Sequence, residues 1–263
     1  ILASLNIHGK TRIIEKTLTR DHTERMMKYL NINFKIRKLN DGIRLIELNG
    51  PYEINSKDIE VVSDPSSASF FIVGALITPG SKIILKNIMI NPTRVTFLKV
   101  LKNMGGKIQI KKTKNLCGEE VGIITAEYSK LKGINIPSKL SALLIDEYPI
   151  LSIAASQATG KTIMKGLDEL RHKESDRINS IVINFRKIGF KVINKKNDLI
   201  IYGKKIKISK KINIKSYDDH RIAMSFSILN IIYDNYLKID NKDCISISYP
   251  KFQKHLNSLT VKY

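Results

Sequence analysis

Three charged segments stand directly before apolar stretches with helical spacing, and they hold most of the side chains in this sequence that could do chemistry. They read Thr19-Arg-Asp-His-Thr-Glu-Arg25, Glu169-Leu-Arg-His-Lys-Glu-Ser-Asp-Arg177 and Asp218-Asp-His-Arg-Ile222. Arginine and lysine at a helix start lie beside the N–H groups of the first turn, which have no partner within the helix, so each segment predicts an anion site. The acids there can cap the helix, balance the arginines or transfer protons. Together the segments predict a cleft that holds a phosphorylated, carboxylated small molecule.

The elements that must position these side chains follow one repeated layout. A polar or acidic start leads into an apolar helix, a small-residue turn and a short strand at residues 66–85, 146–164 and 218–239, and residues 1–14 resemble the end of such a copy. Between them we expect further amphipathic helices, at residues 23–30, 92–101 and 175–182, the last two ending at glycines 105 and 189.

The repeat also predicts the domain organisation. The layout recurs every roughly 70–80 residues, with two helices and about four strands in each copy, as in an α/β repeat fold. The composition shifts near the Val62-Ser-Asp-Pro65 segment, where a new copy begins. We therefore expect residues 1–63 to end one incomplete domain and residues 64–263 to form a second.

Composition restricts the class of protein. The 263-residue chain is 43% hydrophobic and 26% charged, which indicates a globular protein. No apolar run approaches the roughly 18 residues that cross a bilayer, so we expect no membrane partner. The chain opens on Ile1 without an initiator methionine or a basic leader, so we expect no signal peptide and an upstream segment that this sequence lacks. Cys117, Cys244 and the five histidines lack ligand or disulfide spacing, which favours a reduced cytoplasmic setting without a metal site.

The net charge of +21 raises the question of nucleic-acid binding. The lysines are spread along the whole chain, however, and accompany abundant isoleucine and asparagine. The densest basic patch, residues 204–211, alternates as a strand does, with its charges on one solvated face. It contains no aromatic side chain that could stack on a base. We therefore expect no nucleic-acid partner.

The order and spacing of the chain's motifs resemble the 5-enolpyruvylshikimate-3-phosphate (EPSP) synthase family. The matching segments are residues 19–25, Asp64-Pro-Ser-Ser-Ala-Ser-Phe-Phe71, Asn91-Pro-Thr-Arg94, Asp146-Glu-Tyr-Pro149, residues 169–177 and Asp219-His-Arg-Ile-Ala-Met224. The Lys-Glu-Ser-Asp-Arg and Asp-His-Arg-Ile-Ala-Met portions are the most specific. The resemblance covers this whole chain but only about the last three-fifths of the family's usual length.

The resemblance implies both a fold and a reaction. The fold is an inside-out α/β barrel of repeated βαββαβ units in each of two domains, with an active-site cleft between the domains. The reaction is a transferase step of the shikimate pathway, which leads to chorismate and the aromatic amino acids. It moves the enolpyruvyl group of phosphoenolpyruvate to the 5-hydroxyl of shikimate 3-phosphate and releases phosphate. These two small molecules are the implied partners, no cofactor or metal is needed, and we expect a cytoplasmic monomer.

Two carboxylates take catalytic roles by resemblance. Asp146 matches the acid that binds the shikimate hydroxyls and accepts the proton of the attacking alcohol. Glu174 matches the acid that exchanges a proton at the methylene carbon of phosphoenolpyruvate. Simpler interpretations remain: Asp146 could serve only as a helix N-cap, and Glu174, like Arg177, only as part of a solvated first helical turn.

The substrate-binding residues are cations. Lys173 matches a ligand of the shikimate phosphate, and Arg20 matches another from the other domain. Arg177 and Arg221 match two arginines of the phosphoenolpyruvate site, a further one of which lies in the missing upstream region, and Arg177 is expected to clamp the carboxylate in a bidentate manner. We expect Asp219 to orient Arg221 and to cap its helix.

Other charged residues have structural interpretations. We expect His22 to act as a structural hydrogen-bonding group rather than a catalyst. Arg94 could reach the cleft by analogy between the repeats, or it could form a structural ion pair.

The chain also departs from the family pattern. The first catalytic lysine, the glycine-rich loop for phosphoenolpyruvate and the Ser-Ala-Gln segment are absent, and Ile247 stands where many members carry lysine. We therefore expect this fragment alone to be inactive. Two alternatives stay open: an enolpyruvyl transferase acting on UDP-N-acetylglucosamine, and a non-catalytic remnant that binds polyanions.

Overall fold

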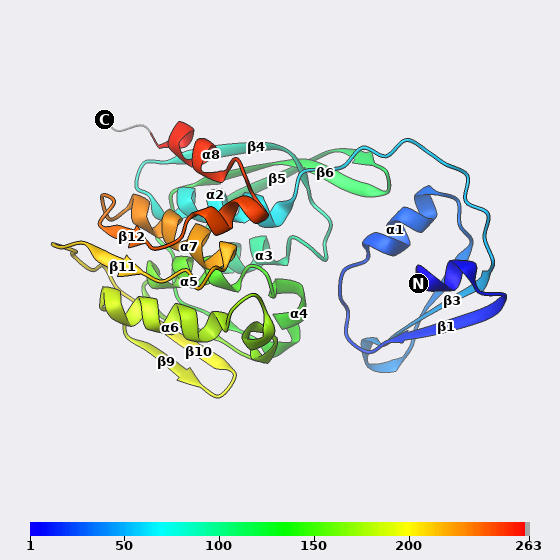
Figure 1. Cartoon of the computed structure of the whole chain (residues 1–263), viewed down its shortest axis with the longest axis horizontal. Helices are drawn as coiled ribbons and strands as arrows, with labels where there is room; N and C mark the ends of the chain where they lie inside the picture. Colours follow the sequence, from blue (N-terminus) through cyan, green and yellow to red (C-terminus); the bar gives the residue numbers. More distant parts are fainter. Residues whose placement is uncertain (261–263) are drawn as a thin grey trace.

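The molecule consists of a small part and a larger part. The computed structural model describes residues 1–260, and Figure 1 shows residues 1–50 as a small body beside the larger one formed by residues 64–260. Residues 51–62, which contain no helix or strand, run between them. The predicted domain boundary at residue 63 falls at the end of this connecting stretch.

The small part is an antiparallel sheet with a helix on one face. Its elements are η1 (Ala3–Asn6), β1 (Gly9–Glu15), α1 (His22–Tyr29), β2 (Phe34–Lys38), η2 (Asn40–Gly42) and β3 (Arg44–Gly50). β3 is the central strand, with β1 and β2 on its two sides. Leu5, Met27, Ile32 and Leu48 form the core, so η1 and α1 lie against the buried face of the sheet.

The larger part holds three sheets. Their strands are β4 (Lys82–Met89), β5 (Lys107–Leu116), β6 (Glu119–Glu127), β7 (Asn135–Ile136), β8 (Gly160–Met164), β9 (Val192–Lys195), β10 (Asp198–Gly203), β11 (Ile212–Ile214) and β12 (Leu237–Ile239). β4, β6 and β5 form an antiparallel sheet in that order. β7, β8, β10 and β9 form a mixed sheet in which only β7 and β8 are parallel. β11 and β12 pair in parallel.

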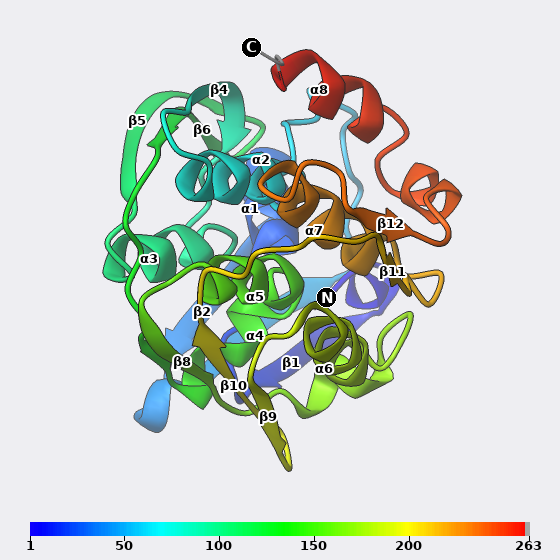
Figure 2. The same ribbon diagram turned by 90° about the vertical axis from the view of Figure 1, so that its left-hand side faces the viewer.

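Three helices that are buried on nearly all sides occupy the middle of the larger part. They are α2 (Pro65–Ile77), α5 (Tyr148–Ser156) and α7 (His220–Ile231), and they pack on one another. Figure 2 shows the sheets arranged around them. Their sequences are apolar on every side because every side meets protein. The remaining helices are α3 (Thr96–Asn103), η3 (Ser138–Leu140), α4 (Ser141–Leu144), η4 (Asp168–His172), α6 (Arg177–Ile188), η5 (Asp243–Ile247) and α8 (Phe252–Leu259).

The predicted repeat is visible in the order of the elements. The series α2–β4–α3–β5–β6 recurs as α5–β8–α6–β9–β10, and α7–β12 opens a third copy. Helices lie inside and sheets outside, as the inside-out α/β fold requires. The arrangement places the starts of α5, α6 and α7 near one another, and these starts carry most of the predicted site residues.

One helix begins later than the sequence predicts. We expected it to start at residue 92, but α3 starts at Thr96 because Asn91 folds the preceding residues into a turn. The carbonyl oxygen of Asn91 accepts the N–H of Arg94, and its side chain accepts the N–H of Thr93. Asn91 is fully buried, so this turn is fixed from inside the protein.

Residues 204–211 do not form the predicted strand. They connect β10 to β11 and contain no regular structure. The predicted alternation is nevertheless present: the lysines are exposed, while Ile206 and Ile208 pack against the main core. Alternation reports which side chains are buried, whereas a strand also needs a neighbouring strand for its backbone hydrogen bonds.

Candidate active site

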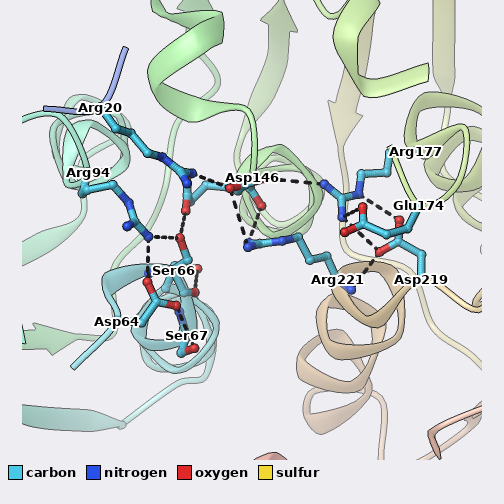
Figure 3. Close-up of polar contacts among 12 residues, drawn as sticks. Arg20, Asp64, Ser66, Ser67, Arg94, Asp146, Glu174, Arg177, Asp219 and Arg221 are labelled. Atoms are coloured by element: carbon cyan, nitrogen blue, oxygen red, sulfur yellow. Dashed lines mark hydrogen bonds and ion pairs between the residues drawn. The ribbon is translucent and has the colours of Figure 1, made fainter. Parts of the chain in front are cut away.

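The predicted site residues come from separate segments that the fold brings together at the junction of the two parts. Arg20 precedes α1 and Asp146 precedes α5, while Arg177 and Arg221 lie in the first turns of α6 and α7. Figure 3 shows the three arginines converging on Asp146. Arg20 is separated from Asp146 by 126 positions in the sequence, so only the fold can join them.

Asp146 lies at the centre of this group. Its carboxylate pairs with Arg20, and Arg177 Nη1 and Arg221 Nη2 each lie 3.7 Å from one of its oxygens. Arg221 Nη1 also donates to the Asp146 carbonyl oxygen at 3.0 Å. Within residues 1–260 its carboxylate makes no capping hydrogen bond to α5, whose N-cap position is occupied by Glu147. The side chain of Asp146 therefore contacts cations rather than the helix that follows it.

The charge state of Asp146 follows from these neighbours. Burial alone would raise the pKa of the Asp146 carboxyl, but the charge of Arg221, the contact with Arg20 and the charge of Lys173 outweigh burial and lower it. Asp146 is thus a carboxylate before any ligand binds.

Arg177 is a fully buried guanidinium with one unpartnered end. Its Nε donates to Asp219 at 2.8 Å, and its Nη2 lies 2.5 Å from Glu174. Its Nη1 is buried and has no hydrogen-bond partner among the described residues. A buried donor without a partner is unfavourable. This end of Arg177 is therefore ready to bind an acceptor that does not belong to the described chain.

Asp219 contacts the guanidinium of Arg177 as well as the backbone of Arg221. Its carboxylate accepts from Arg177 Nε, from Ser175 Oγ and from the backbone N–H of Arg221. The predicted cap of α7 is confirmed. Within residues 1–260 the Asp219 carboxylate makes no hydrogen bond to the Arg221 guanidinium, so the orientation of that side chain by Asp219 stays a prediction. Arg177 is fully buried and requires a carboxylate next to it, whereas Arg221 extends towards Asp146.

Lys173 and Glu174 are exposed members of the site, as is Arg20. The Glu174 side chain is 48% exposed and pairs with Arg177. Lys173 forms no ion pair within the part of the chain that the structure describes, although its charge contributes to the low pKa of Asp146. Both side chains can turn towards a ligand without breaking a fully buried contact.

A second polar group lies behind this site, and sequence reasoning did not assign it to the site. Glu147 is buried and accepts from Ser66 Oγ at 2.5 Å, and Arg94 donates to the same oxygen at 3.0 Å. His22 lies between Arg94 and Glu119. His22 therefore makes structural hydrogen bonds, as we expected, and Arg94 forms an ion pair with Asp64, which is the structural alternative for that residue. The sequence feature that could have indicated this second group is Glu147 itself, an acid that directly follows the candidate base Asp146 at a predicted helix start.

The chemistry of the group can be stated from its charges. Cations outnumber the carboxylates that face them around Asp146, which suits a ligand with several negative charges. Residues 1–260 contain no cluster of three or more His, Cys, Asp or Glu side chains able to hold a metal. None of the helices in this described range is long and apolar enough to cross a membrane.

Comparison with known proteins gives the family. The sequence profile of EPSP synthase (3-phosphoshikimate 1-carboxyvinyltransferase) matches residues 1–256. The chain belongs to the EPSP synthase family.

Curated members of the EPSP synthase family align over nearly the whole chain. The 3-phosphoshikimate 1-carboxyvinyltransferase of Petrotoga mobilis is 44% identical over 252 residues, which cover 96% of this chain and 57% of that protein. The corresponding protein of Zymomonas mobilis is 40% identical, and the alignment covers 100% of this chain and 59% of the relative. The chain therefore spans a little under three-fifths of the length of these relatives.

Solved structures agree with the family and the fold. EPSP synthase from Acinetobacter baumannii superposes with a TM-score of 0.87 at 35% identity, covering 99% of this chain and 59% of that one. The enolpyruvyl transferase NikO from Streptomyces tendae, at 14% identity and a TM-score of 0.70, shares the fold. The predicted two-domain α/β fold class is thus confirmed.

Proposed function

We propose that the complete protein carrying these residues transfers the enolpyruvyl group of phosphoenolpyruvate to the 5-hydroxyl of shikimate 3-phosphate and releases phosphate. The observation that supports this most strongly is the convergence of Arg20, Arg177 and Arg221 on Asp146. The two substrates together bring two carboxylates and two phosphate groups, which need several cations at one place. The alcohol also needs a base before it can attack.

The cations divide between the two substrates. We assign the phosphoenolpyruvate carboxylate to Arg177 and Arg221, and the phosphate of shikimate 3-phosphate to Arg20 and Lys173. Asp146 lies between Arg20 and Arg177 in Figure 3, so a hydroxyl beside it would stand between the two anion sites. This supports placing the reacting oxygen next to Asp146.

The proposed reaction is an addition followed by an elimination. Asp146 accepts the proton of the 5-hydroxyl as the oxygen bonds to C2 of phosphoenolpyruvate, and protonated Glu174 adds a proton to the methylene carbon. In the second step the resulting methyl group returns a proton to Glu174, and the bond between C2 and the phosphate oxygen breaks. Asp146 gives its proton to the departing phosphate, so both acids end as they began.

The contact between Glu174 and Arg177 supports this role for Glu174. Glu174 occupies Arg177 Nη2 at 2.5 Å, beside the unpartnered Nη1. A substrate carboxylate that bound both nitrogens would displace Glu174 from the arginine. The half-exposed Glu174 side chain would then be free to turn towards the methylene carbon. Binding of phosphoenolpyruvate would thus prepare Glu174 for proton transfer.

The deciding experiment is an acceptor test on the complete protein. Phosphate release from phosphoenolpyruvate should depend on shikimate 3-phosphate and should be absent with UDP-N-acetylglucosamine. Release with the nucleotide sugar instead would establish the alternative transferase. Release with neither acceptor, together with a salt-sensitive gel shift of RNA, would favour a polyanion-binding remnant.

We further propose that the protein works as a cytoplasmic monomer with these two small molecules as its partners and without a membrane or nucleic-acid partner. The family resemblance supports this, and sedimentation of the complete protein tests the oligomeric state. We also propose that residues 1–63 belong to one domain and residues 64–263 to the other. The separate hydrophobic clusters of the two parts support this division.

A further inference from the structure

A chain of buried polar contacts runs behind the pair formed by Arg20 and Asp146. Glu147, the residue after Asp146, accepts from Ser66 Oγ at 2.5 Å, and Ser66 Oγ accepts from Arg94 Nη2 at 3.0 Å. Glu147 is 2% and Ser66 1% exposed. Water does not compete for these hydrogen bonds, so losing one leaves a buried polar group unsatisfied.

Arg94 carries the chain across to the small part of the molecule. Its Nη1 lies 3.2 Å from His22 Nε2, and His22 Nδ1 lies 2.6 Å from Glu119 Oε1. The Glu119 carboxylate holds the ring proton on Nδ1, so Nε2 is the acceptor for the N–H of Arg94. Arg94 Nη2 also donates to Asp64 at 2.7 Å, and the arginine side chain is only 12% exposed.

Asn91 adds a second connection beside the first. Its Nδ2 donates to Asp21 Oδ1 at 2.7 Å and to Glu119 Oε2 at 3.0 Å. Asp21 is in turn paired with Arg25 at 2.9 Å. The two residues that follow Arg20, Asp21 and His22, are thus both fastened to the larger part.

We propose that Arg94 is a positioning residue that holds Arg20 and Asp146 opposite each other across the junction of the two parts. It fixes the start of α1 through His22, and the start of α5 through Ser66 and Glu147. The kinetic effects that we expect from replacing Arg94 depend on the proposed function being correct.

Catalysis would need this support when the direct pair opens. The phosphate of shikimate 3-phosphate draws Arg20 away, and Asp146 must be unpaired to accept the hydroxyl proton. The contacts behind the pair then keep both groups in place. Among the residues of this chain, the assigned shikimate 3-phosphate ligands come from both parts, whereas Arg177 and Arg221 both belong to the larger part. Loss of Arg94 should therefore disturb shikimate 3-phosphate more than phosphoenolpyruvate.

The kinetic test is a double-mutant cycle with Arg94→Met and Arg20→Met in the complete protein. Arg94→Met should raise the KM for shikimate 3-phosphate about tenfold and change the KM for phosphoenolpyruvate by less than about twofold. In the Arg20→Met background it should raise that KM by clearly less than in the unmodified protein, because one of the two residues that it positions is gone and only Asp146 remains. Arg171→Met is the matched control, since Arg171 donates to Asp176 at 2.9 Å but shares no partner with Arg20. Its effect should combine with Arg20→Met multiplicatively.

A second test needs no activity. Arg94→Met should speed amide hydrogen exchange along α1 about tenfold relative to α6, and Arg171→Met should leave α1 unchanged. Unchanged exchange in α1 would overturn the proposal. Faster exchange combined with fully independent kinetic effects would make Arg94 a stabilising residue only, which also overturns it. If Arg94→Met does not fold, His22→Leu takes its place under the same criteria, because His22 is 33% exposed and breaks the same connection.

The two tests separate this inference from the proposed function. An unmodified protein that turns over neither acceptor would contradict the proposed function. Exchange in α1 would then decide alone whether Arg94 fastens the start of that helix.

Discussion

The carboxylates of this site differ in what surrounds each of them, and the difference assigns their roles. Asp146 is surrounded by cations that outweigh burial and lower its pKa, so it stays ionised and can receive a proton. Glu174 is half exposed and contacts Arg177, so it can move when a ligand takes its place. Glu147 is buried and faces away from these two, towards Ser66. These surroundings fit the proposed roles of Asp146 as proton acceptor and of Glu174 in proton exchange, while Glu147 makes a structural contact.

Replacing the two proposed catalytic acids should give different defects in the complete protein. Asp146→Asn keeps the shape but loses the base and the negative charge, so turnover should fall by about a hundredfold or more. Binding of shikimate 3-phosphate should weaken as well, because we propose that the acid also contacts its hydroxyls. Glu174→Gln should bind shikimate 3-phosphate almost normally. It should be slow chiefly in exchanging solvent deuterium into the methylene group of phosphoenolpyruvate.

Mass spectrometry of recovered phosphoenolpyruvate during turnover in deuterium oxide measures that exchange in both variants. Normal deuterium incorporation by Glu174→Gln would remove Glu174 from proton transfer. It would leave the side chain as a charge at the start of α6.

Glu147 should make stability depend on pH in the direction opposite to Asp146 and Asp219. Burial raises the pKa of the Glu147 carboxyl, so the folded protein holds this proton to a higher pH than the unfolded chain does. The group's contribution to stability is therefore complete below its unfolded pKa, near about 4, and is lost as the pH rises through its folded pKa. Glu147→Gln keeps an acceptor for Ser66 and removes the titration.

Urea unfolding of both proteins from pH 4 to pH 8 checks this expectation. The free energy of unfolding of the unmodified chain should decline relative to that of Glu147→Gln as the pH rises. Acids with lowered pKa, such as Asp146 and Asp219, are present in both proteins and cancel in the difference. A difference that does not change with pH would mean that Glu147 is not held in its protonated form.

Aspartate occupies the N-cap of both α6 and α7, but the two aspartates make different contacts. Asp176 caps α6 by accepting the N–H of Asn179, and it is partly exposed. Asp219 caps α7 and also holds the buried guanidinium of Arg177, with both side chains fully buried. The first acid stabilises one helix start, whereas the second joins two.

Substitutions at these caps should therefore differ in their effect on the free energy of unfolding. Asp176→Ala should cost about 1 kcal/mol, as an ordinary N-cap does. Asp219→Ala should cost about 3–5 kcal/mol, because it also leaves a buried arginine without its partner. Asp219→Asn, which can still cap, should fall between them. Equal losses for the two alanine variants in urea unfolding would show that the ion pair with Arg177 adds nothing.

The same elements show how far the sequence could predict this molecule. Unbroken apolar runs with polar starts predicted the buried helices, and Gly189, in the left-handed region, ends α6 as predicted. Contacts between distant segments could not be predicted from spacing. The link from Glu147 to Ser66 joins residues 81 apart, and the choice of Arg177 by Asp219 depends on which arginine is buried. Residue types at helix starts indicated a polyanion site, but only packing decides which acid faces which arginine.

The two parts of the molecule have hydrophobic cores of very different extent. The larger part has an extensive hydrophobic cluster, while the small part is centred on Leu5, Met27, Ile32 and Leu48. The contacts across the junction include polar ones made by Arg20, His22 and Arg25. The connecting residues 51–62 are exposed along most of their length. Because polar contacts at a surface contribute less than apolar burial, we expect the two parts to behave as separate units on cleavage between them.

Limited digestion of the 263-residue chain with a glutamate-specific protease tests the proposed boundary. Glu53 and Glu60 lie in the exposed connecting stretch, so the first cut should follow one of them. The larger product should then resist further digestion and unfold cooperatively, because it retains its hydrophobic cluster.

Glu169 and Glu174 are internal controls, since they are also exposed but lie within the larger part. Changing Glu53 and Glu60 to glutamine should slow the first cut and leave later ones unaffected. First cleavage at Glu169 or Glu174 would contradict a boundary near residue 63, because it would mean that the larger part opens before the connection to the small part is cut.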